Sequence, residues 1–264
     1  GMVLSVPGVT VVSMVEAGAR AETVSTAVGM LRADLGATLR LNELADALGY
    51  SPFHLTRVFR TVVGVPPGEF RTALRFDFAK RLLLLERLSV TDTCYEVGFD
   101  SLGTFSSRFS RLVGVSPAEF QRLPELVHES TPDHVIVRSA GDTRAVVRGT
   151  VRAAGCDGPV YVGLFPTSLA YSRPVVGTYL PRPGAFELPA VPLGSYRLLA
   201  AGFPAAADAI ARLLPDQRTQ VGSANRWLRV VTGTERLRAD VRLSPLDPDQ
   251  PPVLVATPAL SLPR

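Results

Sequence analysis

The residues best suited to chemistry lie on one face of a short helix that the sequence predicts over residues 52–63. Spaced at i, i+3, i+4 and i+7, four side chains share that face: Phe53, Thr56, Arg57 and Arg60. Arginine can donate two hydrogen bonds to O6 and N7 of guanine, and phenylalanine or threonine can contact the methyl group of thymine. Such a face is suited to contact base edges, and Ser51 is predicted to be the N-cap of the helix. In the alternative interpretation Phe53 is a core residue and both arginines are ordinary surface charges.

A second predicted helix, over residues 101–113, presents a different set of side chains. Its corresponding face carries Leu102, Gly103, Thr104, Ser106 and Ser107. Leu102 and Gly103 offer no side-chain hydrogen bond, and Arg108 is rotated by about 100° from Ser107. We therefore expect this helix to hold backbone phosphates more than it reads bases, through Arg111 and the amides near Ser101. In the alternative interpretation Arg108 and Arg111 are only solvated.

The elements that position these two faces occur twice, at a constant offset of 50 residues. Residues 55–71 read LTRVFRTVVGVPPGEFR, and residues 105–121 read FSSRFSRLVGVSPAEFQ. Each copy follows a short apolar helix pattern and a turn of glycine and an aromatic residue. A repeat of this length indicates one supersecondary unit used twice. Short helix, glycine turn and second helix is the helix-turn-helix pattern.

Residues 39–121 resemble the DNA-binding domain of the AraC/XylS family of bacterial transcription regulators. The stretch from Gly98 to Phe120 carries the end of that family's signature, G-F-x-S-x-x-x-F-x-x-x-F-x-x-x-x-G-x-S-P-x-x-F. The resemblance implies two helix-turn-helix units joined by a long helix, with double-stranded DNA as the partner. It also implies that Phe53, Thr56 and Arg57 enter a major groove. The chain departs from the family at Ser107, where an arginine is usual.

Apolar residues recur at helical spacing through the first half of the chain. The sequence predicts helices over residues 21–35, 42–48, 52–63, 69–87, 91–97 and 101–113, and a closing helix from residue 116. Residues 2–18 are predicted to be an apolar arm that pairs as a strand or remains loose. The helix over 69–87 would be roughly 29 Å long, close to the roughly 34 Å between successive major grooves on one face of a duplex.

The remainder of the chain changes to short alternating runs separated by Gly and Pro turns. Strands are predicted over residues 145–152, 159–165, 175–180, 185–188, 195–202, 226–231 and 237–243, which indicates an antiparallel sandwich. The pattern resembles the transthyretin-like sandwich of carboxypeptidase regulatory domains, on Gly149, Val160, Val162, Gly184, Phe186, Leu188, Gly194, Tyr196, Gly233 and Leu243. Residues 204–214 depart from it and are predicted to hold a short helix. The last ten residues are predicted to be an edge strand.

The predicted fold class is therefore multidomain α and β. An N-terminal all-α double helix-turn-helix domain covers residues 19–122, a linker covers 123–143, and an all-β antiparallel sandwich covers 144–264. Pro and Gly residues mark the linker. Because arginines are scattered along the strands of the sandwich rather than clustered, we expect the sandwich to touch no DNA.

Charge and cysteine content limit the classes of function. Residues 1–128 hold 13 basic and 13 acidic side chains, so the net charge of +4 arises in the second half of the chain. The two cysteines, Cys94 and Cys156, are predicted to be reduced thiols, which is typical of a cytoplasmic protein. The start lacks the basic region of a signal peptide, and no apolar run approaches the roughly 18 residues of a membrane-spanning helix.

Catalytic motifs are absent from the sequence. His54, His128 and His134 are not at metal-ligand spacing, and no glycine-rich phosphate-binding motif occurs. We therefore predict no enzyme, no metal site and no cofactor. The larger aromatic residues of the second half either line a ligand cleft or belong to the sandwich core: Tyr161, Tyr171, Tyr179, Tyr196 and Trp227.

Together these features predict a cytoplasmic, sequence-specific DNA-binding transcription regulator. The sandwich would form a homodimer, bind a small-molecule effector, or recruit a protein partner, which for an activator includes RNA polymerase. Two alternatives stay open. In one, the chain is an interaction module whose helical domain has weak or no specific DNA binding. In the other, it is a sugar- or peptide-binding sandwich for which DNA contact is secondary.

Overall fold

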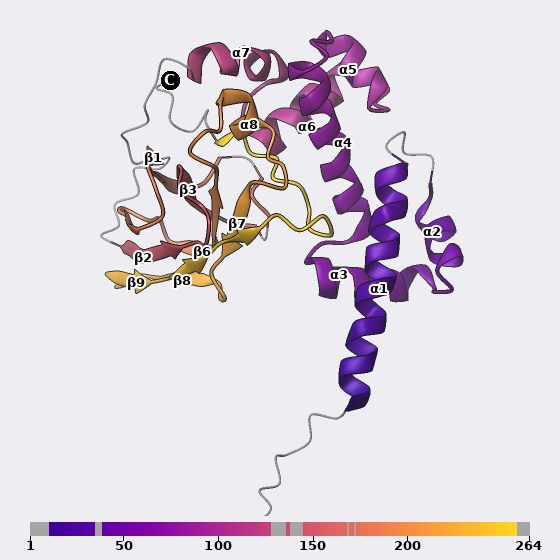
Figure 1. Cartoon of the computed structure of the whole chain (residues 1–264), viewed down its shortest axis with the longest axis horizontal. Helices are drawn as coiled ribbons and strands as arrows, with labels where there is room; N and C mark the ends of the chain where they lie inside the picture. Colours follow the sequence, from indigo (N-terminus) through magenta and orange to yellow (C-terminus); the bar gives the residue numbers. More distant parts are fainter. Residues whose placement is uncertain are drawn as a thin grey trace, which may run out of the picture. The chain divides into compact units, whose positions relative to one another are not determined.

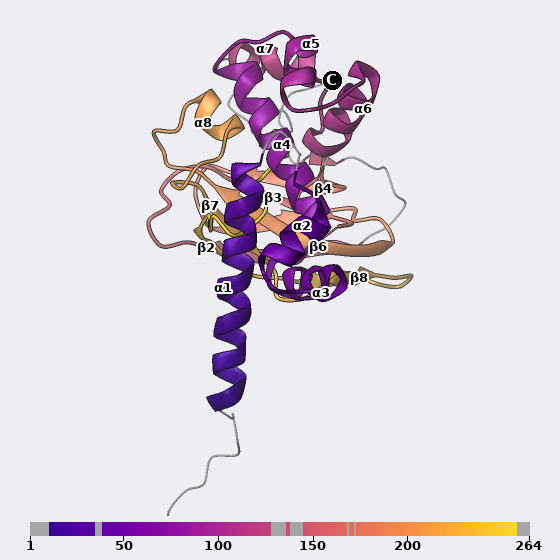
Figure 2. The ribbon, with the colours of Figure 1, turned by 90° about the vertical axis from the view of Figure 1, so that its right-hand side faces the viewer.

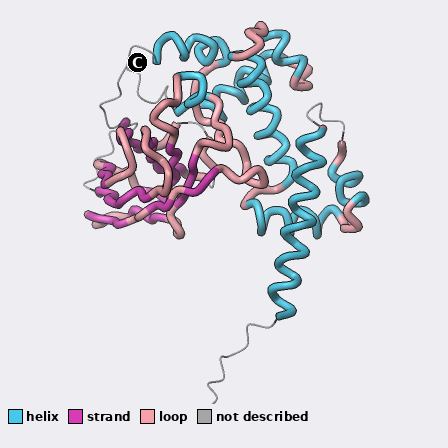
Figure 3. Tube along the Cα trace, in the orientation of Figure 1, coloured by secondary structure: helices cyan, strands magenta, loops and turns pink. Residues whose placement is uncertain are grey.

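The structure, a computed structural model, describes residues 11–34, 39–127, 136–137, 145–167, 169–171 and 173–257. The chain divides into two compact units, Gly1–Thr72 and Ala73–Arg264. Helices dominate up to residue 127, and strands dominate from residue 146 onward (Figures 1 and 3).

The first unit contains α1 (Val11–Ala33), α2 (Leu41–Ala47), α3 (Pro52–Val63) and the start of α4 (Pro67–Leu84). Both α1 and α2 pack against α3 (Figure 2). The rings of Phe59 and Phe70 meet edge to face in this core, with their centroids 5.5 Å apart. Other buried side chains of this unit come from α1, α2 and α3: Val24, Val28, Leu31, Leu44, Leu55 and Val58.

The prediction for the N-terminal arm is wrong for residues 11–18, because α1 already begins at Val11 rather than at residue 21. This stretch contains no proline, so nothing in it breaks the helix before residue 21. Residues 2–10, together with Leu35 and Gly36, where the helix was predicted to stop, lie outside the described residues.

The predicted helix-turn-helix repeat is present in the backbone. The two copies are α2–turn–α3 and α5 (Val90–Glu96)–turn–α6 (Leu102–Val113), and α3 and α6 contain 12 residues each. Four glycines take left-handed conformations at matching points, with φ of +71° at Gly49, +75° at Gly98, +90° at Gly64 and +93° at Gly114. Glycine populates this region without steric cost, so the same turn and the same helix end are encoded twice.

The long helix differs from its predicted bounds. α4 starts at Pro67 and ends at Leu84, which makes its 18 residues about 27 Å long. Leu85, predicted in its apolar stripe, is 54% exposed, because it follows the last helical residue. α4 begins in the first compact unit and ends in the second.

The closing helix extends into the predicted linker. α7 (Pro117–Val127) continues through Pro124, so residues 123–127 are helical. Residues 136–137 form the short strand β1 (Ile136–Val137), and the other linker residues lie outside the described part of the chain. The predicted domain limits of 19–122 and 144–264 stay a prediction, since the compact units meet instead within α4.

Two sheets build the β region. In the larger one the strands follow the order β1, β4 (Val176–Leu180), β3 (Val160–Phe165), β6 (Gly194–Gly202), β7 (Gln220–Ser223) and β11 (Ser244–Pro245), with β8 (Leu228–Val230) also beside β6. In the smaller one β2 (Val146–Arg152) lies between β5 (Ala185–Leu188) and β10 (Val241–Arg242), and β9 (Arg236–Arg238) also pairs with β2. Buried side chains of both sheets form one core, among them Val147, Val151, Leu188, Val162, Leu164, Leu198 and Leu228.

The prediction of an antiparallel β region is confirmed, with two short exceptions in which β9 and β10 run parallel to β2. The strand predicted over 237–243 is divided between β9 and β10, where the backbone of Ala239 lies against Gly149 of β2. A Cβ on Gly149 would lie 1.8 Å from the carbonyl oxygen of Ala239. The sequence missed β7, β11 and β1, and residues 255–257 form no strand. Whether the sandwich is of the transthyretin type stays a prediction.

The second helix-turn-helix unit shares a hydrophobic core with residues from the end of the chain. Aromatic residues of α4, α6 and α7 pack in one buried cluster with Leu213, Leu214, Leu254 and Ala256. The amide of Ala256 donates to the carbonyl of Val113, the last residue of α6, at 3.0 Å. Residues 253–257, here called the C-terminal segment, are therefore part of the support of α6.

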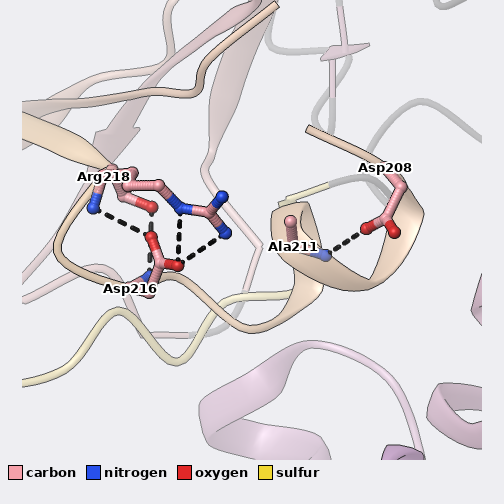
Figure 4. A network of polar contacts seen from close by, with 5 residues as sticks. Asp208, Ala211, Asp216 and Arg218 are labelled. Carbon is pink, nitrogen blue, oxygen red and sulfur yellow. Dashed lines mark hydrogen bonds and ion pairs between the residues drawn. The ribbon is translucent and has the colours of Figure 1, made fainter. Parts of the chain in front are cut away.

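The short helix predicted within residues 204–214 is present as α8 (Ala209–Leu213), and polar contacts fix it (Figure 4). Asp208 caps its start by accepting a 2.7 Å hydrogen bond from the amide of Ala211. Asp216 forms an ion pair with Arg218, with 2.8 Å between Oδ2 and Nη2. These contacts hold the loop that delivers Leu213 to the shared core.

Candidate nucleic-acid interface

The first candidate surface is the outer face of α3. Ser51 caps the helix, and its Oγ accepts a 3.3 Å hydrogen bond from the amide of His54. Phe53 is 80% exposed, which excludes the interpretation of this residue as core. Arg57 and Arg60 are exposed as well, whereas Thr56 is half-buried and its Oγ1 donates to the carbonyl of Pro52 at 2.8 Å. The opposite face of α3 is buried through Leu55, Val58 and Phe59.

An exposed phenylalanine costs free energy in water, since burying such a side chain stabilises by about 1.5–3 kcal/mol. Phe53 is the most exposed of the large hydrophobic residues in the described part of the chain. Its position beside Arg57 therefore combines an apolar contact surface with a guanidinium on the same helix face. Among the predicted site residues, this group agrees best with base recognition.

The second candidate surface is the outer face of α6. Ser101 caps this helix, and its Oγ accepts a 3.4 Å hydrogen bond from the amide of Thr104. Most of the predicted residues are exposed: Ser101, Leu102, Gly103, Thr104, Ser107, Arg108 and Arg111. Ser106 is half-buried, and its carbonyl accepts a 2.8 Å hydrogen bond from Oγ of Ser110. Within each of the two helices, the predicted residues therefore lie on the outer face of that helix.

Both helices carry positive charge without acidic neighbours on the same helix. α3 holds Arg57 and Arg60, α6 holds Arg108 and Arg111, and neither helix contains Asp or Glu. Within the described residues, none of these four guanidinium groups forms a hydrogen bond or an ion pair. Free guanidinium groups on an outer helix face are suited to bind phosphate or guanine.

Two arginines on α4 position these surfaces, and the sequence did not identify them. Arg71 donates to the carbonyl of Leu39, just before α2. Arg75 donates through Nε to the carbonyl of Val97 at 2.6 Å, and its guanidinium lies 4.4 Å from the centre of the Phe99 ring. Val97 and Phe99 flank the glycine of the second turn, so Arg75 holds that turn in place. Arg71 and Arg75 lie one helical turn apart on α4, and this spacing was the signal in the sequence that could have identified them.

Lys80 is a third residue of α4 that the sequence left without a role. Its side chain is completely buried, and Nζ donates to the carbonyl of Val253 in the C-terminal segment at 3.1 Å. Burial lowers the pKa of Lys80 to about 8, while the nearby Asp77 raises this pKa and Arg81 lowers it. The signal was its position, four residues after Phe76 and three before Leu83, both of which are buried.

The described residues contain no group of three or more His, Cys, Asp or Glu side chains that could hold a metal ion. Burial raises the pKa of both Cys94 and Cys156, which keeps these thiols protonated and unreactive. Of the aromatic residues considered for a ligand cleft, Tyr161 and Tyr196 are buried in the sandwich and Trp227 is 44% exposed.

Two helix-turn-helix units, each with an outward-facing helix that carries arginine, define a double helix-turn-helix domain. Residues 44–123 match the protein family described as "Helix-turn-helix domain". Over 83 residues the chain is 37% identical to the HTH-type transcriptional activator AarP of Providencia stuartii, covering 31% of this chain and 62% of that protein. Over 110 residues it is 28% identical to an AraC-like transcription regulator of Streptomyces lividans, covering 42% and 36%. Residues 44–123 therefore contain a helix-turn-helix domain that is similar to those of AraC-like regulators.

Solved structures also show similarity to part of this chain. An AraC-type transcriptional regulator from Chromobacterium violaceum is 27% identical, covers 40% of this chain and 93% of that chain, and gives a TM-score of 0.36. The DNA-binding domain of AdpA in complex with a target DNA is 26% identical, covers 42% and 97%, and gives a TM-score of 0.35. None of the described helices is both long and apolar enough to cross a membrane.

Proposed function

We propose that the chain is a sequence-specific DNA-binding transcription regulator in which α3 reads bases and α6 chiefly holds phosphates. The single observation that carries this proposal is the outer face of α3, where Phe53 is 80% exposed. Arg57 and Arg60 share this face and have no partner among the described residues. Such a face combines a thymine contact with a guanine contact.

The division of labour follows from the composition of the two faces. The α6 face contains Leu102 and Gly103 where α3 carries Pro52 and Phe53, and Ser107 where α3 carries Arg57. Phosphate contacts position a protein on the duplex without specifying its sequence. In this proposal Arg108 and Arg111 supply such contacts.

α4 supports a two-groove arrangement through its length. Its 18 residues span about 27 Å, somewhat less than the roughly 34 Å between successive major grooves on one face of a duplex. The relatives named above are regulators, and the same role is proposed for this chain, in the cytoplasm. In the same proposal the β region binds a small-molecule effector, forms a homodimer or contacts RNA polymerase.

Equilibrium binding tests the proposal. Fluorescence anisotropy would compare the duplex best selected by the full chain with a pool of random duplexes of about two helical turns at the same salt concentration. Specific sites normally exceed non-specific ones by at least about a thousandfold in affinity. A comparable ratio is expected here, whereas equal affinities would leave an interaction module as the better description.

A further inference from the structure

The sheet register gathers arginines that are far apart in the sequence. Arg148 on β2 is the register partner of Arg238 on β9, and Arg152 on β2 is the register partner of Arg242 on β10. Arg236 lies opposite Val146 at the end of the same pairing. Five arginines therefore lie on three adjoining strands of the smaller sheet.

All five guanidinium groups face outward. Val147 and Val151 of β2, Ala239 before β10 and Val241 of β10 are buried in the sandwich core. Side chains alternate between the two faces of a strand, so the arginines that alternate with these residues point away from the core. All five are exposed. We call Arg148, Arg152, Arg236, Arg238 and Arg242 the arginine face.

Specific contacts fix this register. Gly149 leaves room for the carbonyl of Ala239, and the amide of Ala239 donates to the carbonyl of Arg148 at 2.9 Å. The amide of Thr150 donates to Oδ1 of Asp240 at 2.9 Å. Because β9 and β10 are anchored to β2 in this way, the arginine pairs cannot slip out of alignment.

Acidic groups neutralise only part of the arginine face. Glu187 pairs with Arg148 at 2.7 Å, and Asp240 lies 3.6 Å from Arg238. Arg152, Arg236 and Arg242 form no hydrogen bond or ion pair within the described residues. Like charges opposite each other on neighbouring strands destabilise a sheet. A purely solvated face would be more stable with charges of alternating sign at these positions.

The surface is also grooved. A groove of about 650 Å³ is lined by Arg148, Arg236, Arg238 and Glu187, and a second of about 490 Å³ is lined by Arg152, Arg242 and Asp240. Positions 148 and 152 lie about 13 Å apart along β2. A DNA strand carries one phosphate per roughly 3.4 Å of helix axis, so this distance corresponds to about four phosphates.

We infer that the arginine face binds the phosphate backbone of the duplex that the helix-turn-helix units recognise. This inference rests on the proposed function and adds a third contact to it. Guanidinium groups bind phosphate in two-point fashion, which suits a face that holds arginine and no lysine. The sequence-based expectation that the sandwich touches no DNA relied on scattered arginines, and the register brings them together.

The salt dependence of binding tests the inference. The double variant Arg152→Gln, Arg242→Gln would be compared with wild type on the selected duplex at about 50 and about 200 mM salt. The salt slope is the steepness with which the logarithm of the binding constant falls as the logarithm of the salt concentration rises. Each lost phosphate contact lowers this slope by about 0.9. Two lost contacts lower it by about 1.8, so the wild type loses roughly 12-fold more affinity over this range than the variant. Relative affinities for single-base changes in the site stay unchanged, since phosphate contacts carry no sequence information.

A matched control removes the same charge elsewhere. Arg182 lies exposed in the turn between β4 and β5, and Arg229 points outward from β8 in the larger sheet, because its neighbours Leu228 and Val230 are buried. The variant Arg182→Gln, Arg229→Gln should keep the wild-type slope. Equal slopes for both double variants would overturn the inference and leave the proposed function intact. A wild type without sequence preference would overturn both. Thermal unfolding without DNA checks the fold, and the first variant should be at least as stable as wild type, since a like-charge pair is removed.

Discussion

The effect of Lys80→Met on the free energy of unfolding should change sign as the pH rises. Lys80 is completely buried, and Nζ donates to the carbonyl of Val253 at 3.1 Å. The ring of Phe120 lies 5.8 Å from Nζ, and Asp77 and Arg81 are the charged groups nearby. Burial lowers the pKa of Lys80 from 10.5 to about 8, against the opposing influence of Asp77.

The magnitude follows from the shift in pKa. A shift of about 2.5 units corresponds to about 3 kcal/mol, at roughly 1.4 kcal/mol per unit. Between pH 8 and pH 10.5 the unfolded chain binds the proton that the folded chain has released, so the free energy of unfolding rises with pH in this window. Below pH 8 the buried charge costs the folded state about 3 kcal/mol, and above pH 10.5 this cost is gone.

Lys80→Met removes the charge but keeps a side chain of similar length. It also removes the donor for the carbonyl of Val253, and a buried acceptor without a partner costs about 1–3 kcal/mol. At pH 7 the stability gained by removing the charge equals or exceeds the stability lost with the hydrogen bond. The variant is therefore about as stable as wild type, or more stable. Near pH 10.5 only the lost hydrogen bond remains, so the variant is less stable than wild type by about 1–3 kcal/mol.

Urea denaturation at pH 7 and pH 10.5 measures the difference. Trp227 is the one tryptophan of the chain and belongs to the same compact unit as Lys80, so its fluorescence reports the transition. Cys94, Cys156 and Tyr196 titrate in both proteins, and their contributions cancel when the two free energies are subtracted. The difference between variant and wild type should change by about 3 kcal/mol between the two pH values. A difference that does not depend on pH would refute the assignment of Lys80 as a buried, charged donor.

Two further predictions concern the helical domain. Arg57→Ala should cost about 1–3 kcal/mol of binding free energy and relax base preference in one half of the site, whereas Arg111→Ala should weaken all sequences alike and lower the salt slope by about one. The control Arg182→Ala should do neither, and equal relaxation by Arg57→Ala and Arg111→Ala would refute the division of labour. A fragment of residues 1–128 lacks Leu213, Leu254 and Ala256 of the shared core. Burial of a leucine side chain contributes about 1.5–3 kcal/mol, so circular dichroism should show less helix in the fragment than the structure gives for residues 1–128. If the fragment had the helix content that residues 1–128 have in the structure, the importance of the shared core would be contradicted.

Local signals account for what the sequence predicted well. The glycines at positions 49, 64, 98 and 114 each require a left-handed backbone, and their repetition at near-constant offset fixed both helix-turn-helix units. The exposure of Phe53 and Arg57 followed from helical periodicity, since Leu55, Val58 and Phe59 fall on the opposite face. Strands with clear alternation, such as β5 and β6, were placed to within a residue or two.

Contacts between distant residues account for what the sequence did not predict. No local pattern tells that Lys80 meets Val253, or that Ala256 donates to the end of α6. The pairing of Arg152 with Arg242 depends on a parallel register that two short strands form across β2. The division of the strand over 237–243 depends on the close approach of Ala239 to Gly149, which only the folded chain creates.

The central claim is that α3 reads bases while α6 positions the duplex. Its most direct test is a selection of bound sequences from random duplex DNA at fixed salt, carried out in parallel with wild type and with Arg57→Ala. Wild type is expected to enrich a site of about two helical turns. One half of this site should be strongly specified and the other weakly, with the two halves about 10 base pairs apart. Arg57→Ala should lose preference in the strongly specified half alone. Enrichment of no sequence by wild type, or an unchanged site with Arg57→Ala, would contradict the account.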